Sequence, residues 1–208
     1  LVDGNSLTYR AFFALPTDMA TASGQVTNAV FGFTSMLAYV LKDQKPDGIL
    51  VAFDRPEPTF RHKAEPEYKA QRDAAPDILR QQMGLVREVL DALGITSIDQ
   101  VGWEADDLIA TATRKLTDLG EDVIIVTGDR DSYQLVSDPH VRVLYNKRGV
   151  SDYALYDAVE DTAECRNRDE CEESLGDNLM FPYPICGGIV SSCQEQNQLT
   201  SGQGGAMA

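Results

Sequence analysis

Cysteine is absent from the first 164 residues, and the four cysteines of the chain lie between positions 165 and 193. Their spacing contains no Cys-x-x-Cys pair, so the sequence gives no sign of a zinc site. No apolar run approaches the ~20 residues that cross a bilayer, and no membrane association is predicted. A cysteine-free core of this length is typical of an intracellular enzyme that uses no disulfides.

Basic residues are scarce: 18 Lys and Arg stand against 33 Asp and Glu, a net charge of −15. This excess argues against a nucleic-acid partner, because phosphates are bound by Lys and Arg. Residues 161–208 carry 8 of the acids and 2 of the bases, which leaves 25 acids and 16 bases, a net −9, on residues 1–160. Composition alone therefore favours an acidic soluble protein, unless the remaining acids hold metal ions beside a local basic patch.

Apolar runs alternate with helical patterns along residues 1–160. Buried parallel strands are predicted at Leu1-Val2, 48–53 and 122–127, and 141–145 alternates more and is predicted as an edge strand. Helical spacing of apolar residues predicts helices at 27–41, 77–93 and 104–119. Strands that alternate with helices indicate an α/β fold with a mainly parallel central sheet flanked by helices.

The character of the sequence changes after about residue 160. Acid-rich residues give way to an end rich in Gly, Ser and Gln, without sustained periodicity. We therefore expect a core at 1–160 and an atypical, weakly structured tail at 161–208. Because Leu1 already lies in an apolar run, we expect the sequence to begin inside a longer protein.

Carboxylates follow the predicted strands. Asp3 ends the first strand, Asp54 the second, and Asp129 follows the third with Asp131 two residues on. Ligands of parallel α/β sheets bind at the carboxyl ends of the strands, so these side chains are expected to share a cleft. A predicted helix start adds three more acids: Glu104, Asp106 and Asp107.

A cluster of seven carboxylates is costly unless cations neutralise it or some members are protonated. Oxygen ligands favour Mg²⁺ or Mn²⁺, and two such ions can support phosphodiester hydrolysis. Both groups of acids also have a structural interpretation. The helix dipole stabilises acids in a first helical turn, and a single Asp after a strand is often a turn or capping residue. Their coincidence at three strand ends favours the metal site.

Residues 55–76 form a long, proline-rich and basic connection. By composition alone, a solvated surface loop is the simpler interpretation. Beside an acidic metal cleft, the same segment becomes a candidate phosphate clamp, with an aromatic ring able to stack on a base. The predicted DNA-binding residues are Arg61, Lys63, Tyr68, Lys69 and Arg72.

Five strings of the sequence, in order and at matching spacing, resemble the 5′-nuclease domain of bacterial DNA polymerase I, within the wider flap endonuclease family. The resemblance runs from Leu1 to about Tyr156, and the strings together are highly specific. The strings are Val2-Asp3-Gly4-Asn5 with Tyr9-Arg10, Phe53-Asp54 with Phe60-Arg61-His62, Glu67-Tyr68-Lys69-Ala70-Gln71-Arg72, Gly102-Trp103-Glu104-Ala105-Asp106-Asp107, and Thr127-Gly128-Asp129-Arg130-Asp131 with Gln134-Leu135.

The resemblance implies a PIN-like, resolvase-type fold and a 5′-3′ exonuclease or 5′-flap endonuclease with two Mg²⁺ or Mn²⁺ ions. It implies that all seven carboxylates bind metal, some through water, and that Lys69 and Arg72 act catalytically from an arch over the scissile phosphate. Substrates would be DNA with a 5′ flap, a nick or an RNA-primer end, cut without a covalent intermediate during replication and repair. The implied setting is the nucleoid in the bacterial cytoplasm, with a polymerase domain in the same natural chain.

The tail departs from the family pattern. Relatives continue with a Gly-Asp-x-Ser-Asp-Asn motif and a glycine-rich hairpin, whereas this chain has only Gly176-Asp177-Asn178-Leu179. We therefore expect an incomplete second metal site and weak activity. The alternative is an altered nuclease domain that binds metal and DNA with little or no catalysis. A dehalogenase-type phosphatase is disfavoured because it needs Asp-x-Asp, and Asn5 stands at the second position.

Overall fold

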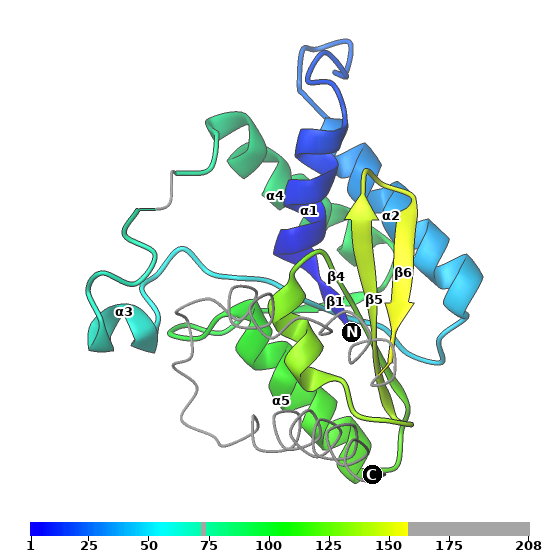
Figure 1. Ribbon diagram of the computed structural model, residues 1–208. Helices are drawn as coiled ribbons and strands as arrows, with labels where there is room; N and C mark the ends of the chain where they lie inside the picture. Colours follow the sequence, from blue (N-terminus) through cyan, green and yellow to red (C-terminus); the bar gives the residue numbers. More distant parts are fainter. Residues whose placement is uncertain (72–73, 158–208) are drawn as a thin grey trace, which may run out of the picture. The chain divides into compact units, whose positions relative to one another are not determined.

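A six-stranded sheet forms the centre of the computed structural model, which describes residues 1–71 and 74–157 (Figure 1). The strand order is β3-β2-β1-β4-β5-β6, and all neighbours are parallel except β5 and β6. This mixed α/β architecture confirms the predicted fold class. The strands are β1 (Val2–Asp3), β2 (Leu50–Ala52), β3 (Thr96–Ile98), β4 (Val123–Thr127), β5 (Val141–Arg148) and β6 (Asp152–Tyr156).

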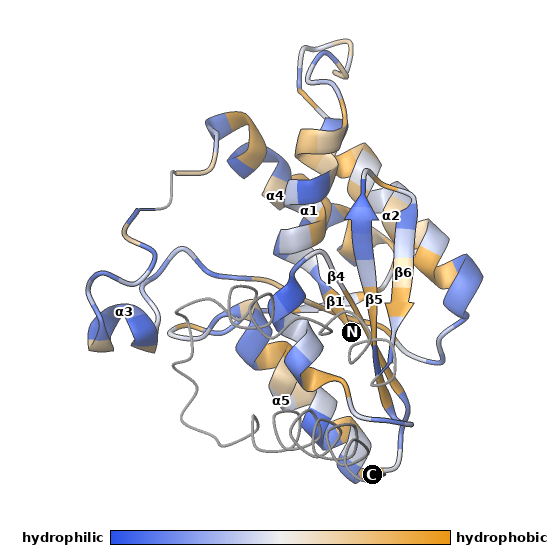
Figure 2. Ribbon diagram, in the orientation of Figure 1, coloured by the Kyte–Doolittle hydropathy of each residue, from blue (hydrophilic) through white to orange (hydrophobic). Residues whose placement is uncertain are grey.

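Helices cover both faces of the sheet, and the strands alternate accordingly. Along β4, Val126 packs with α1, α2 and α4, whereas Ile125 packs with α5 on the other face. The helices carry polar residues on their outer sides (Figure 2). Their bounds are α1 (Gly4–Ala14), α2 (Asn28–Gln44), α3 (Phe60–Ala64), α4 (Asp77–Ala92) and α5 (Ala105–Asp118), with a 3₁₀ helix η1 (Arg130–Leu135) after β4.

The predicted helices at 27–41, 77–93 and 104–119 are confirmed as α2, α4 and α5. The prediction of an edge strand at 141–145 is wrong, because β5 lies between β4 and β6, and β6 pairs antiparallel with its outer side. The sequence did not predict α1, β3 or β6. The long connection at 55–76 contains the short helix α3.

None of the described helices is both long enough and apolar enough to cross a membrane. The predicted tail at 161–208, with the four cysteines and Asp177, lies outside the described residues.

The turn from β1 into α1 depends on a glycine. A Cβ added at Gly4 would lie 2.4 Å from the ring of Phe53, which is fully buried.

We expect Gly4→Ala to lower the free energy of unfolding by about 1–3 kcal/mol, because neither the ring nor the backbone has room to move. Urea denaturation measures the change. The control is Gly84→Ala in α4, where a Cβ meets nothing within 4 Å; it should leave stability unchanged or raise it by up to ~1 kcal/mol. Equal stability of the two variants would contradict the clash.

Candidate active site

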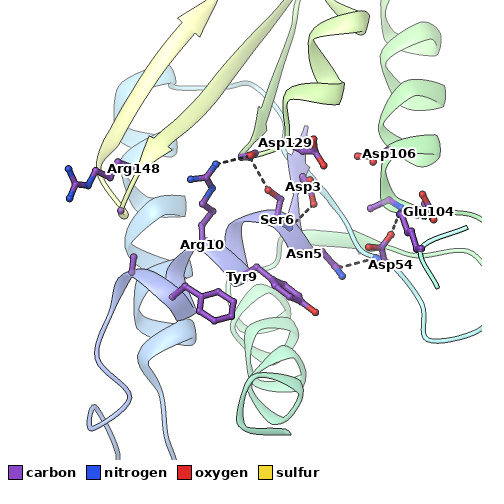
Figure 3. A pocket seen from close by; sticks show the side chains of 16 residues that line it. Asp3, Asn5, Ser6, Tyr9, Arg10, Asp54, Glu104, Asp106, Asp129 and Arg148 are labelled. Carbon is purple, nitrogen blue, oxygen red and sulfur yellow. Dashed lines mark hydrogen bonds and ion pairs between the residues drawn. The ribbon is translucent and has the colours of Figure 1, made fainter. Parts of the chain in front are cut away.

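A pocket of about 790 Å³ opens where β1, β2 and β4 end and α5 begins (Figure 3). The carboxyl ends of the parallel strands meet at this edge, as the positions of the acids predicted. Basic side chains reach it from α1, β5 and the segment after α3, namely Arg10, Arg148 and Lys69. Five of the seven predicted metal ligands line the pocket: Asp3, Asp54, Glu104, Asp106 and Asp129.

Asp3 lies in the pocket and accepts two hydrogen bonds through its carboxylate. It caps α1 by accepting a hydrogen bond from the Ser6 N–H at 2.9 Å, and it accepts another from the Thr127 hydroxyl at 2.9 Å. Burial raises the pKa of Asp3 to about 6, and the charges of Asp54 and Asp129 add to the rise. The two hydrogen bonds oppose this shift without cancelling it.

Asp129 and Asp54 are held by hydrogen bonds to the neighbouring backbone. The Asp129 carboxylate caps η1 by accepting from the Asp131 N–H at 3.0 Å. The Asp54 carboxylate accepts from the Ala105 N–H at 2.7 Å, and its own N–H donates to the Asn5 side chain at 3.1 Å. These contacts tie the end of β2 to the starts of α1 and α5.

Asp106 faces the other acids from the first turn of α5. Burial raises its pKa to about 8, with the charges of Asp3, Asp129 and Asp54 as further causes. Lys69 opposes the shift only weakly. A carboxyl group in such surroundings resists ionisation, and a bound cation would favour its charged form.

Two side chains from the segment after α3 contact Glu104. The Lys69 ammonium lies 2.9 Å from one carboxylate oxygen, and the Tyr68 hydroxyl lies 3.1 Å from the other. Burial lowers the pKa of Lys69, but its hydrogen bond to Glu104 and the charge of that group outweigh burial and raise it. Lys69 also has a positive φ of 56°, a conformation that is uncommon for a residue with a side chain. The predicted clamp thus reaches the carboxylate cluster itself.

Arg61 and Asp107 do not lie where the sequence predicted. Arg61 was expected to contact DNA, yet its side chain is buried and its guanidinium donates to both oxygens of Asp107, at 2.7 and 2.8 Å. Asp107 was expected to bind metal, yet it does not line the pocket and also accepts from the Glu104 N–H at 3.0 Å. The pair fixes α3 against α5, because planar guanidinium and carboxylate groups match in a two-bonded arrangement.

Removing the guanidinium should be costly. We expect Arg61→Ala to lower the free energy of unfolding by about 3–5 kcal/mol, because Asp107 would remain buried without its partner. Urea denaturation in EDTA would measure the loss. The control is Lys63→Ala on the same helix, where the side chain is exposed and the expected change stays within about 0.5 kcal/mol. A loss for Arg61→Ala as small as that of the control would show that the pair contributes little.

The other predicted residues fall into two groups. Asp131 and Lys63 are exposed, and neither lines the pocket. Arg72 lies outside the described residues. The structure therefore brings Lys69 and Tyr68 to the carboxylates and places Lys63 on the surface of α3.

Arg10 and Ser6 are site residues whose roles the sequence did not reveal. The Arg10 guanidinium donates to the Gly128 carbonyl at 2.9 Å and the Tyr145 hydroxyl at 3.1 Å, and the Ser6 hydroxyl accepts from the Gly128 N–H at 2.9 Å. A Cβ at Gly128 would lie 2.6 Å from the Arg10 side chain, so a larger residue at this position would displace that side chain. Figure 3 shows both side chains beside Asp129. Arg10 belongs to the first of the strings that carry the family resemblance, whereas no sequence signal pointed to Ser6.

The donor chemistry of the pocket fits hard divalent cations. Its acids present oxygen ligands; burial, and then the neighbouring acids, raise the pKa values of Asp3 and Asp106, and a bound cation would counter both effects. As the described side chains stand, no three Asp, Glu, His or Cys residues are grouped closely enough to hold one ion together. Glu104 is engaged by Lys69 and Tyr68, so metal binding requires these contacts to rearrange.

The sequence matches a known family model. Residues 1–170 match the family described as the 5′-3′ exonuclease, N-terminal resolvase-like domain. The chain is 52% identical over 157 residues to DNA polymerase I of Mycobacterium tuberculosis, and 45% identical over 156 residues to DNA polymerase I of Bacillus caldotenax. The match covers 75% of this chain in both cases, but only 17% and 18% of the two polymerases.

Solved structures share the fold at lower identity. T5 5′-exonuclease with zinc ions bound superposes with a TM-score of 0.56 at 22% identity, over 79% of this chain and 59% of the other. Bacteriophage T5 flap endonuclease, in a pseudo-enzyme–product complex with DNA and metal ions, gives a TM-score of 0.55 at 21% identity, over 78% and 58%.

Proposed function

The chain belongs to the 5′-3′ exonuclease family, to its N-terminal resolvase-like domain, and on this premise we propose that it hydrolyses DNA phosphodiesters near a 5′ end with divalent cations. The observation that carries the proposal is the pocket at the strand ends, where five carboxylates meet and where Asp3 and Asp106 have raised pKa values. Such a cluster is unfavourable without cations, and a phosphodiester brings no positive charge of its own.

The proposed cations are two Mg²⁺ or Mn²⁺ ions. Asp3, Asp54, Glu104, Asp106 and Asp129 would hold them, and Asp131 remains a predicted ligand. When bound, such ions activate a water molecule and stabilise the leaving oxygen in phosphodiester hydrolysis. Structures of the T5 enzyme contain zinc in one case and metal ions with DNA in another, which supports a divalent-metal site in this fold.

The chain's own residues would position the substrate. Lys69 sits beside Glu104, so its ammonium can pass from that carboxylate to a phosphate oxygen that enters the pocket. Tyr68 directly precedes Lys69 in the chain, so the same movement would also take its hydroxyl away from Glu104. Arg72 is proposed to assist from the same segment. The substrates proposed are duplexes with a 5′ flap, a nick or an RNA-primer end.

A cleavage assay tests this function. A 5′-labelled flap duplex should be cut in Mg²⁺ and left intact in EDTA, and a covalently closed circular duplex of the same sequence should remain uncut because it has no 5′ end. Cleavage of the flap duplex in EDTA would disprove the dependence on metal. Equal cutting of the circle would disprove the preference for 5′ ends.

A second candidate is a domain that binds metal and DNA with little turnover. It is favoured by the tail, which lacks the Gly-Asp-x-Ser-Asp-Asn motif. The two candidates differ in the assay above, because a binding domain would retain flap DNA in Mg²⁺ without cutting it. The relatives are DNA polymerases I, of which the chain spans less than a fifth, and we extend the proposal to a polymerase domain in the same natural protein.

A further inference from the structure

An aromatic pair, formed by the exposed Trp103 and the partly buried Phe60, precedes Glu104 of the pocket, and neither residue has been assigned a role. Trp103 is 49% exposed, and its ring centroid lies 5.1 Å from that of Phe60, with the planes tilted by 56°. Neighbouring Val101 is 55% exposed. A tilted contact leaves much of the indole face uncovered, so a flat apolar group can bury that face by stacking on it.

Two contacts of Phe60 fix the position of the aromatic pair. The Phe60 N–H donates to the Gly102 carbonyl at 3.0 Å, which joins α3 to the loop that carries Trp103. The Arg61 guanidinium lies 4.5 Å from the Phe60 ring centroid and is itself fixed by Asp107. Rings that are already ordered lose little conformational entropy when a ligand stacks on them.

The position of the pair points to a nucleic acid. Trp103 directly precedes Glu104, whose carboxylate contacts Lys69 and Tyr68. Lys63 follows Phe60 by three residues, so the two share one side of α3. Lys63 is exposed and has no ion-pair partner among residues 1–71 and 74–157. Aromatic rings with a neighbouring cation are the elements with which proteins bind single-stranded DNA.

We propose that Phe60 and Trp103 form a stacking subsite for an unpaired base of a single-stranded 5′ arm, with Lys63 contacting an adjacent phosphate. The inference rests on the proposed function, since it requires DNA with a 5′ arm to reach the cleft. It extends that function by giving the enzyme a means to distinguish a flap from a nick.

The fluorescence of Trp103 tests the proposal directly, because it is the only tryptophan of the chain. The 208-residue protein is titrated in EDTA, so that the DNA stays intact, with three unlabelled duplexes. One carries a single-stranded 5′ arm, one carries the same arm built from abasic nucleotides, and one is nicked without an arm. We expect quenching of the emission by the first duplex only, because the abasic arm keeps the phosphates but has no base to stack.

Variants supply an independent measurement, by anisotropy of labelled DNA. Trp103→Ala should weaken binding of the duplex with the arm by at least about fivefold and leave binding of the nicked duplex unchanged. Trp103→Phe keeps a ring and should retain most of the affinity. Lys63→Ala should reduce the salt dependence of arm binding by about 0.7 in the log–log slope, the effect of one single-strand phosphate contact. Unchanged affinity of Trp103→Ala for the nicked duplex also shows that the variant is folded.

The results distinguish failure of the subsite from failure of the function. If anisotropy shows binding of the duplex with the arm while Trp103 emission stays constant, or if the abasic arm quenches equally, the stacking subsite is overturned and the proposed function stands. If Trp103→Ala binds the arm as the parent does, the subsite is also overturned. If none of the DNAs binds, either in EDTA or with Ca²⁺ in its place to neutralise the carboxylates, both the subsite and the proposed function fail.

Discussion

Asp54→Asn is expected to reduce cleavage of flap DNA by about 10²-fold or more while the protein stays folded. Asp54 lines the pocket from the end of β2, and metal ions supply several kcal/mol of transition-state stabilisation that depends on their ligands. The asparagine keeps an oxygen that can accept from the Ala105 N–H, so the tie between β2 and α5 survives. Only the charge is removed.

The measurement pairs single-turnover cleavage with calorimetric titration of Mn²⁺ and thermal denaturation in EDTA. Metal affinity should fall together with the rate, and stability in EDTA should be unchanged or slightly higher, because one like charge leaves the cluster. Asp118→Asn is the matched control, an exposed aspartate at the end of α5. If Asp54→Asn cleaved like this control, the pocket would not be the catalytic centre.

Lys69→Ala is expected to lower the single-turnover rate by about 10²-fold while weakening DNA binding less than about tenfold. The reason is that a donor aimed at a phosphate whose charge develops in the transition state affects rate more than ground-state affinity. The same result is expected for Arg72→Ala. Rates and affinities measured at two salt concentrations separate this role from a general electrostatic one.

Lys63→Ala is the comparison for Lys69, because it removes the same charge from the exposed side of α3. It should weaken binding and reduce the salt dependence without slowing bound substrate. If Lys69→Ala behaved in the same way, Lys69 would serve only as part of an electrostatic surface. A surface loop without function would show neither effect.

The sequence was sufficient for β1, β2 and β4 and for the acids that follow them. The parallel strands, buried on both faces, read as continuous apolar runs, and the edge at which their carboxyl ends meet follows from the fold class. Asp3, Asp54 and Asp129 could therefore be placed in one pocket before any coordinates. Composition alone made the segment of Lys69 a surface loop; the acidic cleft made it a candidate phosphate clamp, and its catalytic role was implied only by the resemblance.

The sequence did not indicate which distant segments contact one another. Arg61 and Asp107 are 46 positions apart, and nothing in either helix pattern indicates that α3 packs against the start of α5. The strand β3 has only three residues, Thr96-Ser97-Ile98, too few to show a period. The helix α1 begins immediately after the two-residue strand β1. Asp3 is both the last residue of this strand and the N-cap of the helix, and the sequence pattern indicated only its role as a candidate ligand.

The central place of β1 in the sheet has a consequence for synthesis on the ribosome. β1 pairs with β2 on one side and with β4 on the other, where Val2 lies opposite Val126, 124 positions later in the chain. A growing chain can pair β1 with β2 early, but the other edge of β1 stays open until β4 emerges, on the order of several seconds later at ~5–20 residues per second. Asp129 arrives after β4, so the carboxylates of the pocket cannot all be in place before nearly all of the sheet has been made.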